Sequence, residues 1–406
     1  MNKLFYLLLT GLFITSCTSN DDGGGIIVPP NVDTTLKGVI SADQTLTKDK
    51  IWELEGRVVV ADGATLTIEA GTIIKAFAGS GSQASTLIIA RGGKIDAQGT
   101  ATAPIIMTST SDNIKVGETA GTNLSENDRG LWGGLLILGN APGSFEGDVS
   151  EVQIEGIPPS DTNGLYGGSN AADNSGIVKY VSIRHGGAEI GEGNEINGLT
   201  LGAVGSGTVI DHIEVVGNVD DGIEFFGGTV NASNLIVWAS GDDGLDIDQA
   251  YSGTITNSMV ILGNASDHAL EIDGPEGSAT GQFTLDGITL IGNTTTEKGE
   301  YADFRSKAMG TTKNVYAKGF KDSSDVELDN DGVATNYTAG LLMFSNWEIE
   351  LPSGVTSSAA IFADKSTVGS TFEADAITFS AAVTTPTVGA NTSVFSWTFA
   401  SKKSAF

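Results

Sequence analysis

The sequence predicts an all-β protein, a right-handed parallel β-helix in which short strands are wound into coils that stack on one another. Three observations predict this fold: a high glycine content, a near absence of helical periodicity and a repeat of 22–32 residues. Glycine accounts for 55 of the 406 residues and charged residues for only 17%, against averages of roughly 7% and roughly 25%. Such a chain is rich in turns and small residues, as a solenoid of short strands requires.

The repeat is visible along most of the chain. Residues 59–66 and 88–95 align residue for residue with an offset of 29. In the centre, four apolar triplets are predicted to occupy equivalent places in successive units, at residues 213–215, 235–237, 259–261 and 288–290. Such a unit cannot bury a core alone, but stacked coils with strands ~4.8 Å apart can. The competing folds are a propeller, whose blades need roughly 40 residues or more, and a jelly roll, which does not repeat in register.

The beginning of the chain indicates export and a lipid anchor. Residues 1–16 are predicted to form a signal peptide, with a short apolar run followed by small residues. Residues 14–17 resemble the lipobox of bacterial lipoproteins, which implies that Cys17, the only cysteine, carries the lipid. The alternative is a plain signal peptide with an incidental thiol. Residues 17–35 form an acidic, glycine-rich tether, whose acids resemble a lipoprotein surface-export signal and imply the outer face of the outer membrane.

The rest of the chain divides into a solenoid and a terminal region. We predict the β-helix over residues 36–332, with right-handed winding because parallel crossovers are overwhelmingly right-handed. Two loops are expected to project from it, at residues 113–129 and 145–176. Residues 333–406 are predicted to form terminal coils or a β cap over the open end of the stack. Two segments of this region look like strands outside the register of the repeat, 341–349 and 393–399.

The charge of the chain limits its partners. Fifty acidic residues stand against 21 basic ones, which gives a net charge of −29. Nucleic acids and anionic membrane surfaces are therefore poor partners, and we expect no nucleic-acid binding, while cations are favoured. With only three histidines and one cysteine, the chain also lacks the ligands of a typical zinc cluster.

One acidic residue recurs in the second strand of successive units. These residues are Glu224, Asp246, Glu271, Asp303 and Glu327. In a register of stacked coils they form an outward column with a spacing of ~4.8 Å, whose mutual repulsion favours bound Ca²⁺, a hard cation with oxygen ligands. The alternative is that the acids only form turns and keep the surface soluble. A second candidate cation site is the loop 189–195, which offers three carboxylates and an amide.

A further pattern runs through the turns of the same units. It consists of Asp221, Asp242, Asp243, His268, Arg305 and Lys307. Its order and spacing resemble the polygalacturonase family of glycoside hydrolases, which places Asn-Thr-Asp, Asp-Asp, Gly-His-Gly and Arg-x-Lys on successive coils. The resemblance implies that Arg305 and Lys307 hold the substrate.

The same resemblance assigns catalytic roles. It implies that Asp221 and Asp243 are general bases acting on water, that Asp242 protonates the leaving oxygen, and that His268 tunes them electrostatically. The sequence departs from the family before Asp221, where Val219-Asp220 replaces Asn-Thr, and around His268, which has no glycine neighbours. The alternative is that the likeness arises from the turns shared by all such coils.

Longer blocks indicate a broader relationship. Residues 63–72, 184–187 and 220–224 resemble a widespread group of β-helix bacterial surface lipoproteins, and this resemblance covers about 36–399. It implies the pectate-lyase-like superfold without a settled activity. The sequence therefore predicts a surface protein that binds a glycan on its acidic face and is a candidate inverting glycoside hydrolase. The alternative function is a non-catalytic adhesin, scaffold or accessory subunit of an outer-membrane transporter.

Overall fold

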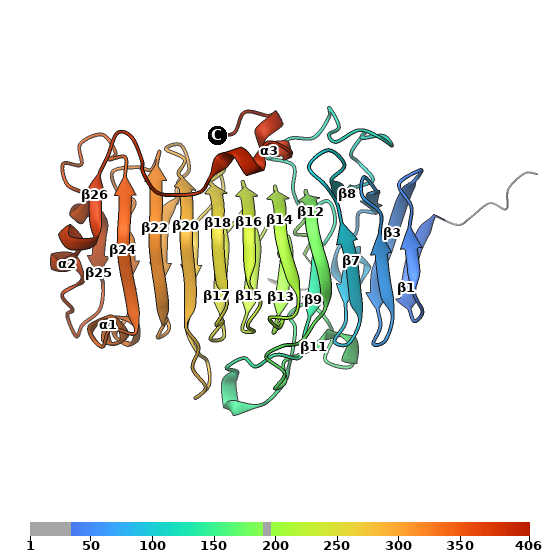
Figure 1. Cartoon of the computed structure of the whole chain (residues 1–406), viewed down its shortest axis with the longest axis horizontal. Helices are drawn as coiled ribbons and strands as arrows, with labels where there is room; N and C mark the ends of the chain where they lie inside the picture. Colours follow the sequence, from blue (N-terminus) through green and yellow to red (C-terminus); the bar gives the residue numbers. More distant parts are fainter. Residues whose placement is uncertain (1–33, 190–195) are drawn as a thin grey trace, which may run out of the picture. The chain divides into compact units, whose positions relative to one another are not determined.

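The computed structural model describes residues 34–189 and 196–406, so the predicted signal peptide, Cys17 and most of the tether lie outside the described residues. Residues 34–406 form one unit in which a single sheet of 24 strands winds along the stack (Figure 1). The pairings within this sheet are parallel, coil upon coil. The prediction of a right-handed parallel β-helix is confirmed.

The later coils alternate a short strand with a long one. The short strands stack into what we call the short-strand face, formed by β6 (Thr86–Ile89), β9 (Leu135–Leu138), β13 (Leu199–Gly202), β15 (Ile223–Phe226), β17 (Leu245–Asp248), β19 (His268–Ile272), β21 (Glu300–Phe304), β23 (Val326–Leu328) and β25 (Phe362–Asp364). The long strands are β3 (Ile51–Val60), β12 (Gly176–Arg184), β14 (Val209–Val216), β16 (Ala232–Trp238), β18 (Thr254–Ile261), β20 (Phe283–Ile291), β22 (Gly310–Lys318) and β24 (Leu342–Ile349).

The remaining elements lie at the two ends and in the loops. The strands are β1 (Thr35–Ile40), β2 (Gln44–Leu46), β4 (Thr65–Ile68), β5 (Ile73–Ala76), β7 (Lys94–Gln98), β8 (Ile105–Ser109), β10 (Val152–Gln153), β11 (Leu165–Tyr166) and β26 (Ser380–Ala382). The α-helices are α1 (Asp331–Thr338), α2 (Phe372–Phe379) and α3 (Phe399–Lys402). Strands β10 and β11, in the second projecting loop, form a separate antiparallel pair outside the main sheet.

A residue with a left-handed backbone conformation bends each long strand, so that the two parts of the strand lie on two faces of the solenoid. Most of these strands bend at one residue with positive φ, for example Asn257 (49°) and Asn314 (56°). Asparagine tolerates this conformation because its side chain forms local hydrogen bonds. Here those bonds run between coils, since Nδ2 of Asn257 donates to Oδ1 of Asn234 (2.5 Å) and Nδ2 of Asn346 to Oδ1 of Asn314 (2.8 Å). The bend is thereby repeated in register from coil to coil.

The register of the repeat is confirmed in part and corrected at one place. Val59 pairs with Ile88 and Leu66 with Ile95, as the offset of 29 predicts. The triplet predicted at 259–261 is wrong by one residue, because Ile236 pairs with Met259 and Ser258 takes the inward place. Ser258 is fully buried there, and its hydroxyl accepts a hydrogen bond from the backbone N–H of Leu235. The triplets were aligned by their apolar residues, so the polar Ser258 at a core position shifted the predicted triplet by one residue.

The C-terminal region closes one end of the stack and then returns along it. The prediction that 341–349 is out of register was wrong, since β24 pairs in register with β22. Residues 393–399 are also not a strand but include a 3-10 turn and the start of α3. Helix α2 buries Phe372 and Phe379 against the core at the end of the stack (Figure 1).

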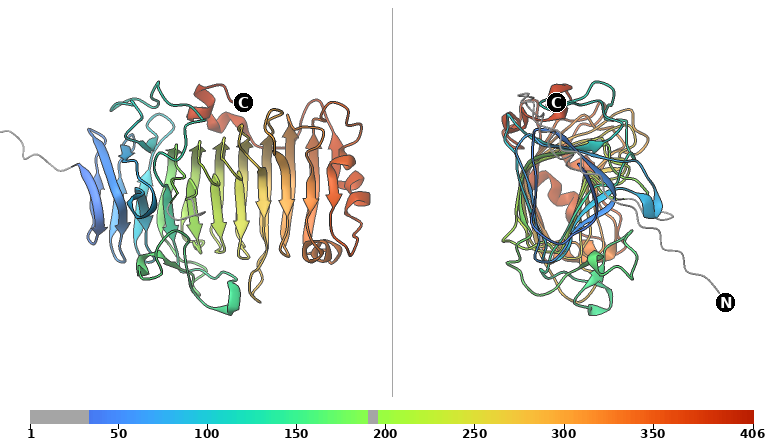
Figure 2. Two further views of the ribbon diagram at one scale, coloured as in Figure 1. Left: turned by 180° about the vertical axis from the view of Figure 1, so that it is seen from behind. Right: turned by 90° about the vertical axis from the view of Figure 1, so that its right-hand side faces the viewer.

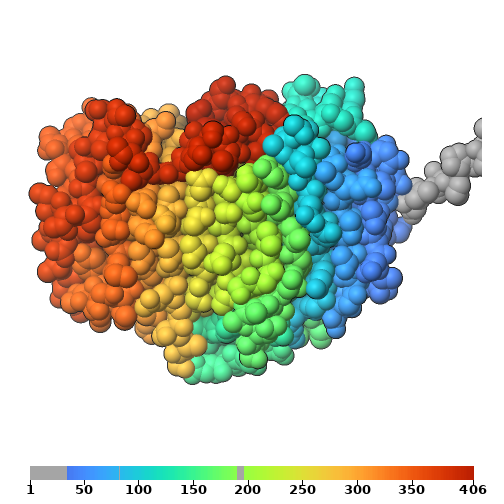
Figure 3. Space-filling view, viewed as in Figure 1, coloured from blue at the N-terminus to red at the C-terminus, as the bar shows by residue number. Residues whose placement is uncertain are grey.

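Beyond β26 the chain runs back over the long strands toward earlier coils (Figures 1 and 3). Its backbone N–H groups bond to successively earlier coils, from Glu348 through Thr289 to Glu214. Phe395 and Phe399 pack there against Trp238 and other apolar side chains on the outer surface. We call residues 383–406 the return segment.

Candidate functional site

The predicted acidic column exists in the predicted register. Glu224 pairs with Asp246, Asp246 with Glu271, Glu271 with Asp303, and Asp303 with Glu327. Their strand neighbours, such as Ile223 and Phe225, point into the core, so the acids point outward. They are nevertheless largely buried, and the exposed fraction is below 10% for each except Glu327. The assignment of the column as a metal site stays a prediction.

The same column is apolar in the earlier coils. Its places there are taken by Val59, Ile88 and Leu136, followed by Thr200. The loop predicted at residues 145–176 covers this apolar part with Phe145, Ile154, Ile157 and Tyr166, and it hangs from the stack beside the short strands (Figure 2). The short-strand face therefore has an apolar half under a loop and an acidic half beyond Thr200.

A second column lies three residues before the first, in the turns that lead into the short strands. It contains Asn197, Asp221, Asp243 and His268. The two aspartates each bond to the backbone of the next coil, because Asp221 Oδ1 accepts the N–H of Asp243 (2.8 Å) and Asp243 Oδ1 accepts the N–H of His268 (2.7 Å). Gly222 follows Asp221 because a Cβ there would lie 2.3 Å from a methyl group of Val237.

The two columns meet in a buried carboxylate cluster. Asp221, Glu224 and Asp246 each expose less than 10% of their surface, and each offers an oxygen within 4.8 Å of the others. Two carboxylates ~4 Å apart repel by about 4 kcal/mol at an effective dielectric constant near 20. Burial, followed by the charge of neighbouring carboxylates, therefore raises the pKa of all three well above the usual range. Among the described residues, no lysine, arginine or histidine forms an ion pair with them.

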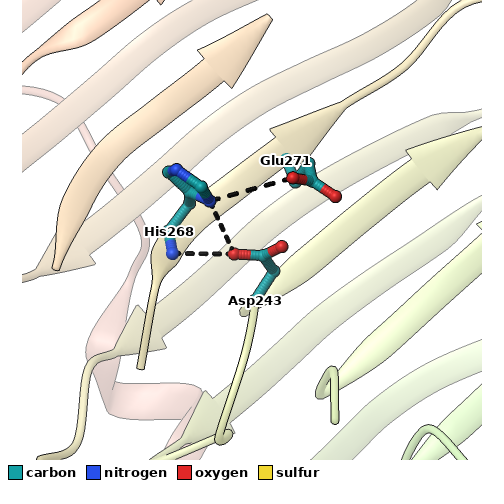
Figure 4. A group of neighbouring side chains, drawn as sticks. All are labelled: Asp243, His268 and Glu271. Atoms are coloured by element: carbon teal, nitrogen blue, oxygen red, sulfur yellow. Dashed lines mark hydrogen bonds and ion pairs between the residues drawn. The ribbon is translucent and has the colours of Figure 1, made fainter. Parts of the chain in front are cut away.

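One coil further on, the cluster continues with a histidine (Figure 4). Nδ1 of His268 lies 2.9 Å from Oδ1 of Asp243 and 3.9 Å from Oε1 of Glu271. Burial opposes the charge of the ring, but the hydrogen bond and the charge of Asp243 raise the pKa of His268 to about 9. Burial and the charge of Asp243 raise the pKa of Glu271 to about 8, although Arg305 acts in the opposite direction. The histidine is thus a cation bound between two carboxyl groups.

Arg305 connects this group to a pocket. Its Nη2 donates to Glu271 (2.6 Å) and its Nε to Asp273 (2.7 Å). Asp273 also lines a pocket of about 440 Å³ together with Asp248, Gly274, Pro275, Glu276, Ser306 and Lys307. Lys307 is exposed at this rim. The two residues predicted to bind substrate therefore lie next to one concave surface that carries several charged side chains.

Asp242 occupies the edge of the acidic region. It is half-buried, and burial followed by the charge of Asp243 raises its pKa. On the next coil Asp267 takes the equivalent place and binds Lys298 (2.5 Å). At the far end of the column, burial and the charge of Glu327 raise the pKa of Asp303 to about 7. Glu327 itself is paired with Lys365 at 3.4 Å.

The structure brings most of the predicted site residues onto one face. Asp221, Asp243, His268, Glu271 and Arg305 form a continuous chain of contacts, and their catalytic or binding roles stay predictions. Cys17 and most of the candidate loop 189–195 lie outside the described residues.

Sequence reasoning missed two members of the site, Asn197 and Asp273. Asn197 carried a usable signal, since it precedes a glycine at the start of a short strand, as Asp221 and Asp243 do. Asp273 carried none, because nothing in the repeat marks it as the partner of Arg305.

Comparison with known proteins places the chain in a family. No described helix is both long and apolar enough to cross a membrane. No curated protein and no solved structure matches the chain. A family model described as a pectate-lyase-like β-helix domain matches residues 38–400, which is nearly the whole described solenoid with its return segment. The chain therefore belongs to the family of the pectate-lyase-like β-helix domain.

Proposed function

We propose that the protein is anchored at the cell surface through a lipid on Cys17 and binds a glycan on the acidic half of its short-strand face. The observation that carries the binding proposal is the position of Arg305, which is held by Glu271 and by Asp273, a residue that lines the pocket. Paired carboxylates and cations in a concave surface suit a sugar, whose hydroxyl groups both donate and accept hydrogen bonds. The fold of the family is also compatible with a role in carbohydrate recognition.

The negative net charge of the protein limits which glycans can bind to it. A net charge of −29 repels a polyuronate, and Arg305 and Lys307 offset only part of that repulsion. A neutral glycan, or an acidic one bridged by calcium, is therefore the ligand that we propose.

Binding is tested by calorimetry against a panel of neutral and anionic polysaccharides. We expect Arg305→Ala and Lys307→Ala to weaken binding at least tenfold. Lys313→Ala is the matched control, because Lys313 is comparably exposed but pairs with Asp286 on another face of the coil. If no polysaccharide binds, or if the control variant loses as much affinity as the other two, the glycan proposal fails and the scaffold or adhesin alternative takes its place.

Anchoring is tested separately. Replacing Cys17 with serine removes the site of acylation, so we expect the variant to leave the membrane fraction. Protease added to intact cells is expected to cleave the wild-type protein, since we propose that it faces outward. A wild-type protein that is found free of membranes contradicts the anchor, and one that resists protease contradicts the surface location.

A further inference from the structure

We propose that one calcium ion is bound inside the short-strand face by the carboxylates of Asp221, Glu224 and Asp246, with the amide oxygen of Asn197 as a further ligand. This site lies in the buried part of the acidic region and joins three successive coils through β13, β15 and β17. Its role is structural, and it does not depend on the proposed glycan binding.

The distances fit a single ion. One oxygen from each of the three acids lies within 4.8 Å of the others. Calcium binds oxygen at roughly 2.3–2.6 Å, so two ligands on opposite sides of one ion are separated by about 4.6–5.2 Å. Three carboxylates supply up to six oxygens, and calcium takes six to eight. The cluster therefore needs no rearrangement of the backbone to surround the ion.

A second observation, independent of the number of acids, points to a ligand. Oδ1 of Asp246 and Oδ1 of Asn197 are both buried and have no hydrogen-bond partner among the described residues. Asn197 is fully buried, and its Nδ2 donates to Glu224, so its amide group stands against the cluster. Buried acceptors are normally satisfied, because leaving one without a partner costs free energy. A cation between the coils satisfies both oxygens at once.

Asp303 shares this need in part, since its Oδ1 is also buried without a hydrogen-bond partner among the described residues, but Glu271 and Glu327 do not. Glu271 is held by Arg305, with His268 nearby, and Glu327 is paired with Lys365. Within the described parts of the chain, the cluster of Asp221, Glu224 and Asp246 has no such cationic side chain. The cluster is therefore neutralised from solution, by protons or by a bound cation. Calcium is preferred to magnesium because the latter requires strict octahedral geometry and retains its water.

The test compares wild type with Asp246→Asn. Asparagine has nearly the same shape as aspartate but no charge, so the variant loses calcium affinity and also loses repulsion inside the cluster. In chelator, we expect the variant to melt above wild type. In millimolar calcium, we expect wild type to gain several degrees and to melt above the variant, because a ligand of the folded state stabilises it by mass action. Calorimetry with calcium alone should give binding to wild type that Asp246→Asn lacks.

Asp303→Asn is the matched control. Asp303 belongs to the same column and is equally buried, but it lies in a separate acidic group with Glu327 and Asp329, outside the proposed calcium cluster. This variant is expected to keep the calcium-dependent gain in melting temperature. The proposal is overturned if calcium and chelator give identical melting curves for wild type, or if Asp303→Asn loses the same gain as Asp246→Asn. If Asp246→Asn does not fold, Glu224→Gln is measured in its place with the same expectations.

Discussion

Nη2 of Arg305 donates a hydrogen bond of 2.6 Å to Oε2 of Glu271, whose strand lies one coil earlier in the stack. Through its Nε the same guanidinium bonds to Asp273 at 2.7 Å. A planar guanidinium can hold two carboxylates in fixed directions, which a lysine ammonium cannot. Arg305 therefore fastens two coils to each other at the edge of the pocket.

We expect Arg305→Gln to destabilise the protein by about 1–2 kcal/mol. Breaking a fully buried pair costs roughly 3–5 kcal/mol, but the side chain of Arg305 is 37% exposed, so solvent screening reduces the loss. The measurement is urea unfolding at neutral pH. Lys365→Gln is the control, since Lys365 is 48% exposed and its pairs with Asp325 and Glu327 should contribute little. Equal losses in the two variants would show that the bridge between coils is no stronger than a surface ion pair.

The raised pKa values of the acidic face predict a protein that loses stability as the pH rises. The folded pKa is about 8 for Glu271 and about 7 for Asp303, while their unfolded values are 4.5 and 3.8. Between these limits the folded state binds more protons than the unfolded state, so the free energy of unfolding decreases with increasing pH. His268 acts in the same direction, because its folded pKa of about 9 lies above its unfolded value of 6.5.

In chelator, the melting temperature is therefore expected to be higher at pH 5 than at pH 8. Scanning calorimetry at several pH values checks this directly. Asp303→Asn removes one of the titrating groups and should flatten the dependence. A melting temperature that rises between pH 5 and pH 8 would mean that these carboxyl groups are ionised at little cost in the folded state.

The fold could be predicted because similar segments of a repeat pair with each other on adjacent coils, so the repeat itself indicates which residues are neighbours. Residues 59–66 and 88–95 are similar enough to be aligned, and in the structure they are neighbours on adjacent coils. The slip at Ser258 shows the limit of this reasoning, since the alignment followed apolar character and a buried serine broke it. The column of acids followed from the same repeat and was placed correctly.

What could not be predicted depends on contacts outside the repeat. Arg305 bonds to Asp273, and the return segment reaches Glu214 from position 400, a separation of 186 residues. No periodic pattern relates such partners. The burial of the acidic column was also unexpected, because strand alternation gives the direction of a side chain but not what covers it.

The bend at Asn257 predicts how much stability the protein loses when this residue is replaced. Asn257 has a φ of 49°, and its side chain bonds to Asn234 and accepts the N–H of Asn391. Asn257→Ala should lower stability by about 2 kcal/mol, because alanine is strained at positive φ and leaves the hydrogen bonds unmade. Asn257→Gly should cost less, since glycine adopts this φ freely. The comparison is made by urea unfolding, and a glycine variant that is weaker than the alanine variant contradicts the role of backbone strain.

The return segment should stabilise the earlier coils. Phe399 is buried at 2% exposure, and its ring lies 4.7 Å from the guanidinium carbon of Arg184. Phe399→Ala should cost about 3–5 kcal/mol through the lost burial and the cavity. Phe406→Ala is the control, since Phe406 is 38% exposed and should matter little. Chemical unfolding measures both, and a small loss for Phe399→Ala would mean that the segment lies on the coils without supporting them.

Hydrolysis is the sharpest consequence of the resemblance to polygalacturonases. An inverting pair of carboxyl groups must be roughly 6.5–9.5 Å apart to admit a water molecule. The oxygens of Asp221 and Asp242 approach within 4.8 Å, which is too close for such a pair, so we propose Asp243, which contacts His268, as the base. Asp242 suits the acid, because burial and the charge of Asp243 raise its pKa and keep it protonated to a higher pH than an ordinary aspartate.

If the protein cleaves its glycan, Asp242→Asn should lower kcat by about 10²-fold or more while affinity and fold survive, because asparagine cannot donate the proton. Asp267→Asn is the matched control, since Asp267 holds the equivalent place on the next coil and binds Lys298. The rate of wild type should fall as the pH rises above the pKa of Asp242, since only the protonated acid acts. Nuclear magnetic resonance of the first product identifies the anomer. A retained anomeric configuration, or full activity in Asp242→Asn, rules out this mechanism. If no polysaccharide of the panel is cleaved, the acidic half of the short-strand face is a binding surface only.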